Sequence, residues 1–223
     1  MRRLLVFDLD DTLYPERSFV LSGFRASSDW LEARHSVSGF YDQAAGLFEE
    51  GLRGTIFNEA LARVGLAAED AMVKSLIEVY RGHAPRIALH EDAVWALDHF
   101  GAKLALGLLT DGYAATQRNK VAALDIAGRF QTIVYTDDLG RERWKPSPAP
   151  YLKIMEATGR SGVECIYVAD NPLKDFVAPN ALGWMTVQVL RDGGEYANVV
   201  ASEGHQAQHR VTDLYRLEQL ICV

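Results

Sequence analysis

Short runs of apolar residues recur along the chain, and most of them are apolar almost throughout. A strand covered on both faces, as in a parallel sheet, has this continuous character, whereas a half-exposed strand alternates. The pattern therefore predicts five buried parallel strands. The runs are RLLVF (3–7), KLALGLL (103–109), TIVY (132–135), ECIYV (164–168) and WMTVQVL (184–190).

Between the later runs lie two stretches with the 3.6-residue spacing of helices, 113–124 and SPAPYLKIMEATG at 147–159. The second stretch begins with prolines and ends with a glycine, as is typical of the two ends of a helix. Strands that alternate with helices predict an α/β fold with a doubly wound parallel sheet. The apolar residues at helical spacing are Val121, Leu124, Tyr151, Ile154 and Met155.

Residues 14 to about 90 follow a different pattern. TIFNEALARVG (55–65) and EDAMVKSLIEVY (69–80) each carry one apolar stripe at helical spacing, and no convincing strand interrupts them. A block of helices inserted between the first and second strands predicts a separate lobe. We therefore expect an α/β core formed by residues 1–15 and 88–223 and a helical domain at 16–87.

The net charge, the apolar stretches and the cysteines of the chain limit the classes of function that we expect. The chain has 223 residues, of which 48% are hydrophobic, and a net charge of −7, which argues against a nucleic-acid or anionic-membrane surface. No apolar stretch approaches the roughly 20 residues of a membrane span. The two cysteines, Cys165 and Cys222, form no disulfide framework, so we expect a cytoplasmic protein.

The unusual polar residues follow the ends of the predicted strands. One aspartate at a strand end is usually a turn or a helix cap. Several such ends with matched chemistry indicate a common site, because the ligand crevice of an open parallel sheet lies beyond the carboxyl ends of its strands. These residues are Asp8, Asp10, Asp11, Thr110, Asp111, Gly112, Asp137, Asp138, Lys145, Asp170 and Asp175.

Carboxylates gathered this closely repel one another unless a positive charge lies among them. Asp8, Asp170 and Asp175 would offer hard oxygen donors around one point, which suits Mg²⁺. Such a cation usually shares its ligands with a phosphate. The expected cofactor is therefore Mg²⁺ and the expected partner is a small phosphorylated metabolite.

Donors for phosphate oxygens are available at the same strand ends. Lys145 would supply a second positive charge, and Thr12 and Thr110 would offer hydroxyl groups. The TDG turn, with Asp111 and Gly112, would offer backbone N–H groups.

Four segments resemble, in order and spacing, the four motifs of the haloacid dehalogenase-like (HAD) superfamily. The agreement extends over the whole predicted α/β core, and the helical insertion resembles the small α-helical cap that many members carry after the first motif. The segments are DLDDT (8–12), LLTDG (108–112), KPSP (145–148) and VADNPLKD (168–175).

The resemblance implies a role for each matching residue in a phosphatase. Asp8 would be the nucleophile that forms an aspartyl-phosphate, and Asp10 would protonate the leaving oxygen and later activate water. Thr12 would help to orient Asp10. Thr110 and Lys145 would hold the phosphoryl oxygens, and Lys145 would also offset the charge of Asp8.

The resemblance also implies where the metal lies. Mg²⁺ would sit between Asp8, the backbone carbonyl of Asp10 and Asp170, with Asp175 outside the ligand shell or reached through water. Asp11 has no such role, and we expect it to face away and cap the turn.

Two positions depart from the family pattern. Asp111 stands where the second motif often has Asn, so its carboxylate must turn away from a bound phosphate. Ala169 stands where the fourth motif often has Gly, which adds one methyl group to the turn. Neither change removes a charged participant, so we expect activity to survive.

Residue 10 separates the reactions that the family supports. Halide leaves without a proton, whereas an alkoxide needs one, so Asp10 favours phosphate-ester hydrolysis over dehalogenation. A phosphomutase would keep the same four motifs. A non-catalytic binding module would commonly lose the nucleophile or the acid, and both Asp8 and Asp10 are present.

The helical domain is expected to select the substrate, with sugar phosphates and nucleoside 5′-monophosphates as the leading candidates. In YPERSFVLSGFRA (14–26), Arg17 and Arg25 either face the substrate or are solvated. The sequence selects neither the ester nor the oligomeric state. The apolar residues expected to pack the helical domain are Phe19, Leu21 and Phe24.

Overall fold

The computed structural model describes residues 3–221, and contacts divide the chain into two compact units. The sheet unit comprises the residues up to 16 together with those from 88 onward, and the helical unit comprises residues 17–87.

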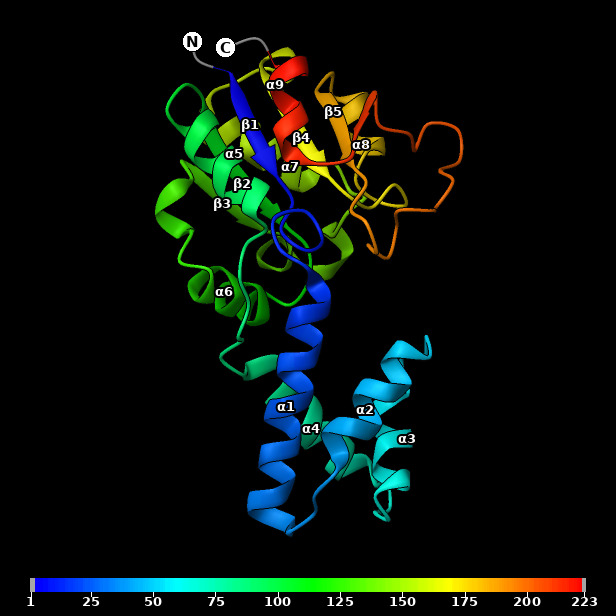
Figure 1. The fold of residues 1–223 in the computed structure, drawn as a ribbon. Coiled ribbons are helices and arrows are strands. Elements are labelled where there is room, and N and C mark those ends of the chain that lie inside the picture. The colour runs from blue at the N-terminus through cyan, green and yellow to red at the C-terminus, as the bar shows by residue number, and fades with distance from the viewer. Residues whose placement is uncertain (1–2, 222–223) are drawn as a thin grey trace. The chain divides into compact units, whose positions relative to one another are not determined.

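The sheet unit is built on six parallel strands in the order β3-β2-β1-β4-β5-β6 (Figure 1). All five predicted strands and the α/β fold are confirmed. The sixth strand, β6, was not predicted, because it has three residues and two of them are exposed at the sheet edge. The strands are β1 (Leu4–Phe7), β2 (Ala105–Thr110), β3 (Thr132–Tyr135), β4 (Cys165–Ala169), β5 (Met185–Val189) and β6 (His209–Val211).

Helices cover both faces of the sheet. Residues of α7 (Ala149–Thr158) and α8 (Val177–Ala181) form one apolar core with alternate side chains of β1 and β4. On the other side, α5 (Glu91–Gly101) contacts β2 and the C-terminal turn at Leu214–Arg216. The predicted helices at 113–124 and 147–159 are confirmed as α6 (Ala114–Ala123) and α7.

Short elements complete the sheet unit. A final helix, α9 (Leu217–Leu220), follows the C-terminal turn. The remaining elements are 3₁₀ turns at Ala127–Arg129, Thr136–Leu139, Arg141–Arg143 and Gly162–Glu164.

The strand order places β1 at the point where the chain reverses direction across the sheet. From β1 the chain passes to β2 and β3 on one side, then returns through α7 to β4 on the other. The loops after β1, β2 and β4 therefore meet at the carboxyl edge of adjacent strands, which is where α/β sheets bind ligands.

The helical unit contains no strand in residues 17–87, all of which are described. The predicted helices at 55–65 and 69–80 are confirmed as α3 (Ile56–Arg63) and α4 (Asp70–Gly82). Two further helices, α1 (Glu16–His35) and α2 (Phe40–Glu49), lie before them. That this unit acts as a cap stays a prediction.

Aromatic rings hold the helical unit together. Phe24 and Phe57 both pack against the Tyr80 ring, with centroids 5.8 and 5.6 Å away. Tyr80 also lies against the backbone of α1, where a Cβ added at Gly23 would come within 2.4 Å of the ring. The absence of a side chain at Gly23 therefore allows α1 and α4 to pack closely.

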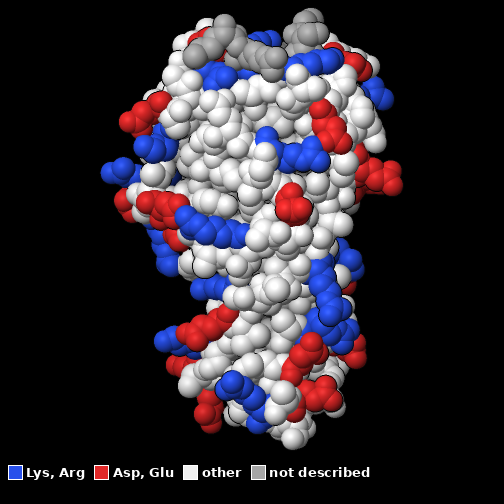
Figure 2. Space-filling model, turned by 90° about the vertical axis from the view of Figure 1, so that its left-hand side faces the viewer, with Lys and Arg blue, Asp and Glu red and all other residues white. Residues whose placement is uncertain are grey.

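Charged side chains of both signs are interspersed on the face that Figure 2 shows, in each of the two units. On that face, the described side chains form no continuous basic surface of the kind that nucleic acid binding requires. Within residues 3–221, no helix has the length and apolar character needed to span a bilayer.

Candidate active site

The residues of all four motifs meet at the carboxyl edge of the sheet. Asp8 directly follows β1, and its backbone N–H donates to the Val168 carbonyl of β4 at 2.9 Å, which extends the ladder by one step. Thr110 ends β2, and Asp170 follows β4. Side chains far apart in the sequence therefore lie around one point because neighbouring strands end there.

Lys145 connects two of these acids. Its Nζ donates to Oδ1 of Asp8 at 2.5 Å and to Oδ1 of Asp175 at 2.8 Å, and it also lies 2.9 Å from the Tyr167 hydroxyl. The side chains of Lys145 and Asp175 are fully buried. The predicted pairing of Lys145 with Asp8 is thus present, and Asp175 holds the amine from its other side.

Burial and the charge of the partner have opposite effects on the pKa values of Asp8 and Lys145. Burial, together with the nearby Asp175 charge and partly offset by Lys145, raises the pKa of Asp8 to about 7. Burial also works against a charged amine, yet Asp175 and Asp8 raise the pKa of Lys145 well above its ordinary value. Lys145 therefore stays positively charged beside the carboxylate of Asp8.

Asp10 lies in a separate polar cluster. One carboxylate oxygen accepts from Lys120 Nζ at 2.6 Å and from the Tyr14 hydroxyl, and the other accepts from Gln117 Nε2 at 3.2 Å. Burial opposes ionisation of Asp10, but the Lys120 charge and these hydrogen bonds outweigh it, and the pKa of Asp10 is lowered. Asp10 is consequently an anion held by three donors.

Sequence reasoning missed all three of these donors. Gln117 and Lys120 lie three residues apart on α6, directly after the TDG motif, and both are buried. Two polar residues at i and i+3 on a predicted helix that follows a motif are a usable sequence signal, since that spacing places them on one face. The Tyr14 partner has no comparable signal.

The hydroxyl of Thr12 has no hydrogen-bond partner within the described residues, although the side chain is fully buried. The hydrogen bonds to the Asp10 carboxylate come instead from Lys120, Tyr14 and Gln117, and the orienting role of Thr12 stays a prediction. Thr110, also fully buried, donates from its hydroxyl to Gln117 Oε1 at 3.1 Å.

Neighbouring groups of the loops hold the carboxylate of Asp111. One oxygen accepts from the Thr136 hydroxyl at 2.7 Å and from the Lys145 backbone N–H at 3.1 Å, and the other from Lys174 Nζ at 3.3 Å. Although burial opposes ionisation, these neighbours lower the pKa of Asp111, with the Lys145 charge acting most strongly among them. Gly112 follows with φ of +124°, a conformation that side chains rarely adopt.

Asp11 also has the position expected of it. Its Oδ1 accepts from the Glu16 backbone N–H at 2.8 Å and so caps the first turn of α1. Asp11 itself has a positive φ of 49°.

Two carboxylates and a carbonyl fit the predicted metal. Asp170 is buried, and its pKa lies well above the ordinary value because of that burial and then the charges of Asp8 and Asp175. This mutual repulsion is what a cation would relieve. Mg²⁺ is typically held by one or two carboxylates together with waters, and Asp8, Asp170 and the Asp10 carbonyl supply such a donor set.

Both carboxylate oxygens of Asp175 already accept hydrogen bonds, which limits the contribution of Asp175 to metal binding. One oxygen accepts from Lys145 and Tyr167, and the other from the Asn171 backbone N–H at 3.2 Å. Consistent with this, no group of three or more Asp, Glu, His or Cys side chains in residues 3–221 is arranged to hold a metal ion. A contact between Asp175 and Mg²⁺ through water stays a prediction.

Comparison with known sequences places this site in a family. The sequence model described as haloacid dehalogenase-like hydrolase matches residues 5–189. The glyceraldehyde 3-phosphate phosphatase of Methanopyrus kandleri is 28% identical over 89% of this chain and 88% of its own length. The phosphoserine phosphatase of Thermus thermophilus is 31% identical over 72% of this chain and 63% of its own length.

Solved structures have the same fold. The HAD-hydrolase YfnB of Bacillus subtilis, bound to magnesium, matches with a TM-score of 0.71 at 17% identity, covering 100% of this chain and 99% of its own. The 2-haloacid dehalogenase of Pseudomonas syringae matches with a TM-score of 0.66 at 22% identity, over 99% and 98% of the two chains.

Proposed function

Since the chain belongs to the haloacid dehalogenase-like hydrolases, we propose that it is a Mg²⁺-dependent phosphatase of small organic phosphate monoesters. The observation that carries this proposal is the pairing of Asp8 with Lys145 beside a second acid, Asp10, in the same loop. Both relatives named above are phosphatases of small phosphorylated compounds.

In the first step, Asp8 attacks phosphorus and the ester oxygen leaves. Within the described chain, the hydrogen bonds to the Asp8 side chain come from Lys145 and reach only Oδ1, which leaves Oδ2 available as the nucleophile. The new bond joins Asp8 to phosphorus, and Asp10 gives its proton to the departing oxygen. Asp8, Asp170 and the Asp10 carbonyl would hold Mg²⁺, which would supply positive charge to offset that of the phosphoryl group.

Asp10 must carry a proton for that step, although Lys120 lowers its pKa. A dianionic phosphoryl group that arrives beside Asp10 raises this pKa, because like charges disfavour the ionised form. In the second step the ionised Asp10 takes a proton from water, the water oxygen attacks phosphorus, and the bond to Asp8 breaks. Asp10 thus acts as an acid while the ester is bound, and the Lys120 charge favours its ionised form for the base role in the second step.

Asp10 also distinguishes this reaction from dehalogenation, which needs no proton donor for the leaving halide. The similarity to the 2-haloacid dehalogenase, at 22% identity, concerns the fold alone. Cytoplasm is the proposed compartment, consistent with Cys165 as a buried free thiol. The proposed substrates are compounds of the size of triose phosphates or phosphoserine, in line with the relatives.

Turnover of an aryl phosphate tests the proposal. We expect the chain to release phosphate with Mg²⁺, to lose activity in EDTA and to regain it when Mg²⁺ is restored. Asp8→Asn removes the nucleophile but keeps the Lys145–Asp175 pair, so the variant should fold and be inactive. Equal turnover by the parent chain and by Asp8→Asn would contradict the proposal, as would full activity in chelator.

A further inference from the structure

A cavity of about 630 Å³ lies within the helical unit, and no step proposed above uses it. Its walls come from residues 17–29 of α1, from α2 and from the segment that follows α4. The cavity is formed entirely by residues of one compact unit, residues 17–87. Its shape is therefore a property of that unit alone.

The charge of the lining is opposite to that of the chain. Three arginines, Arg17, Arg25 and Arg86, line the cavity against one carboxylate, Asp29, whereas the chain as a whole has a net charge of −7. Such a local excess of positive charge attracts small anions.

Two of the three arginines have unused binding capacity. Arg17 is bound to Glu49 through Nε at 2.9 Å and through NH2 at 2.5 Å. In contrast, neither Arg25 nor Arg86 forms an ion pair with any residue from 3 to 221. Their guanidinium groups each carry several N–H donors in a geometry that matches carboxylate and phosphate oxygens.

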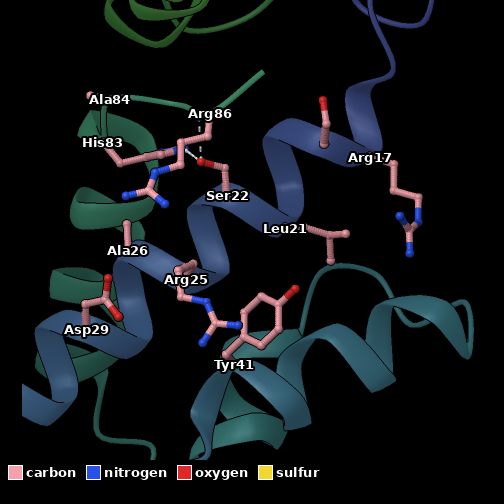
Figure 3. Close-up of a pocket in the computed structure, with 11 residues that line it drawn as sticks. Arg17, Leu21, Ser22, Arg25, Ala26, Asp29, Tyr41, His83, Ala84 and Arg86 are labelled. Atoms are coloured by element: carbon pink, nitrogen blue, oxygen red, sulfur yellow. Dashed lines mark hydrogen bonds between the residues drawn. The ribbon is translucent and has the colours of Figure 1, made fainter. Parts of the chain in front are cut away.

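Arg25 is held in place by an aromatic ring. Its guanidinium carbon lies 3.5 Å from the centroid of the Tyr41 ring, and Figure 3 shows the two side chains stacked inside the pocket. Stacking restricts the side chain without using its in-plane N–H groups. Arg25 is thus prepositioned to donate to a ligand.

The segment that carries Arg86 is fixed to α1 through Ser22. The Ser22 hydroxyl oxygen accepts from the Arg86 backbone N–H at 2.9 Å and lies 3.2 Å from Nε2 of His83. Nδ1 of His83 lies 2.6 Å from the Tyr80 carbonyl, which can only accept, so Nδ1 carries a proton. Ser22, His83 and Arg86 lie together at one end of the pocket (Figure 3).

From these contacts we propose that the pocket is a binding site for a small oxyanion, a carboxylate or phosphate group held by Arg25 and Arg86. Tyr41 and Ser22 supply polar atoms beside the two arginines, and Leu21 and Ala26 supply an apolar wall for the body of the ligand. Two sources share this chemistry: a second acidic group of the substrate, or a separate anionic metabolite.

Calorimetric titration of the full chain with inorganic phosphate and with malonate tests the site directly. The double variant Arg25→Gln/Arg86→Gln is expected to lose about tenfold or more in affinity, since a charge-assisted hydrogen bond to each guanidinium disappears. Arg34→Gln is the matched control, because Arg34 also lies on α1 over an aromatic ring, Trp30, at 5.4 Å, but does not line the pocket.

The outcomes separate this site from the candidate active site. Lys145→Met should leave malonate binding unchanged. Affinity that is equal in the parent chain and in Arg25→Gln/Arg86→Gln would overturn the proposal, as would binding that is lost in Lys145→Met. Thermal unfolding without anion verifies that each variant is folded, and the double variant is expected to fold because both arginines are exposed.

Kinetic measurements identify the source of the anion. This part of the test rests on the proposed phosphatase function. If the anion is part of the substrate, the double variant raises KM for phosphate esters that carry a carboxylate and leaves KM for glycerol phosphate unchanged. If it is a separate metabolite, malonate changes the turnover of glycerol phosphate by the parent chain but not by the double variant. Absence of turnover would defeat the proposed function and leave the calorimetric result standing.

Discussion

Two aspartates of one loop, Asp8 and Asp10, are placed in opposite electrostatic surroundings. Burial, partly offset by Lys145, raises the pKa of Asp8 to about 7. Lys120, 2% exposed, overcomes burial and lowers the pKa of Asp10. Asp10 therefore ionises at lower pH than Asp8, although both lie in one loop.

Replacement of Lys120 should change the pH dependence of turnover. In Lys120→Met the ammonium that lowers the pKa of Asp10 is gone, so this pKa rises and Asp10 binds a proton at higher pH. The base that activates water is then protonated over a wider range. We expect the acidic limb of the kcat profile to move to higher pH.

The control for that variant is Lys153→Met, which removes an exposed lysine of α7 that is paired with Glu156. Its profile should match the parent profile. If the acidic limb of the kcat profile does not move in Lys120→Met, Lys120 does not set the pKa of Asp10.

The motif residues could be predicted from the sequence, but their partners could not. Strand ends converge by topology, so the sequence could predict that Asp8, Asp170 and Lys145 lie near one another, and Lys145 and Asp8 are hydrogen-bonded. The Lys120–Asp10 pair joins residues 110 positions apart, and only the packing of α6 against the loop after β1 brings them together. Thr12, which the family pattern assigns to Asp10, is instead unpaired in the described chain.

Among the elements, five of the six strands were predictable because they are mostly apolar, whereas the short and largely polar β6 was not. Helix α1 was not predicted as an element, since several of its buried positions are small or polar, including Gly23, Ser27 and Ser28. The expected packing of Phe19 and Phe24 is confirmed, whereas Leu21 is only half-buried and lines the pocket. A helix that packs through small residues lacks the apolar stripe that sequence patterns detect.

The close contact between α1 and α4 gives a prediction for stability. Gly23→Ala places a methyl group within 2.4 Å of the Tyr80 ring, so the ring must move and the chain loses stability. We expect a decrease in the free energy of unfolding of about 1–3 kcal/mol, the usual range for overpacking. Denaturant unfolding of the full chain measures it.

Gly46→Ala on α2 is the opposite case, because open space surrounds that position. Alanine there should stabilise the helix by about 0.5–1 kcal/mol, since glycine is a poor helix former. A Gly23→Ala chain as stable as the parent would mean that Tyr80 is not packed against α1 as described.

For the whole molecule, the cluster of acids couples stability to pH and metal. Burial raises the pKa of Asp8 from 3.8 to about 7, so between these values the folded chain keeps a proton that the unfolded chain releases. Unfolding then releases protons, and the free energy of unfolding contributed by this group falls as the pH rises through the window.

Mg²⁺ should raise the free energy of unfolding again at pH values at which the carboxylates are ionised. At about 100 times its Kd, a ligand adds about 2.7 kcal/mol, a rise in Tm of roughly 5–10 °C for a chain of this length. We expect a larger rise at pH 8 than at pH 5.5, and no rise in Asp170→Asn. Equal rises in Tm at both pH values, or a rise in Tm that persists in Asp170→Asn, would show that these acids do not bind the metal.

The central claim is that Asp8 becomes covalently bonded to phosphorus, and intact-mass analysis of an acid-quenched Asp10→Asn reaction tests it most directly. Loss of the base should slow turnover by about 10²–10⁴-fold and let the intermediate accumulate. The account predicts one phosphoryl group per chain, located on the peptide that contains Asp8 and absent from Asp8→Asn/Asp10→Asn. A phosphoryl group on another residue, or its persistence in the double variant, would contradict it.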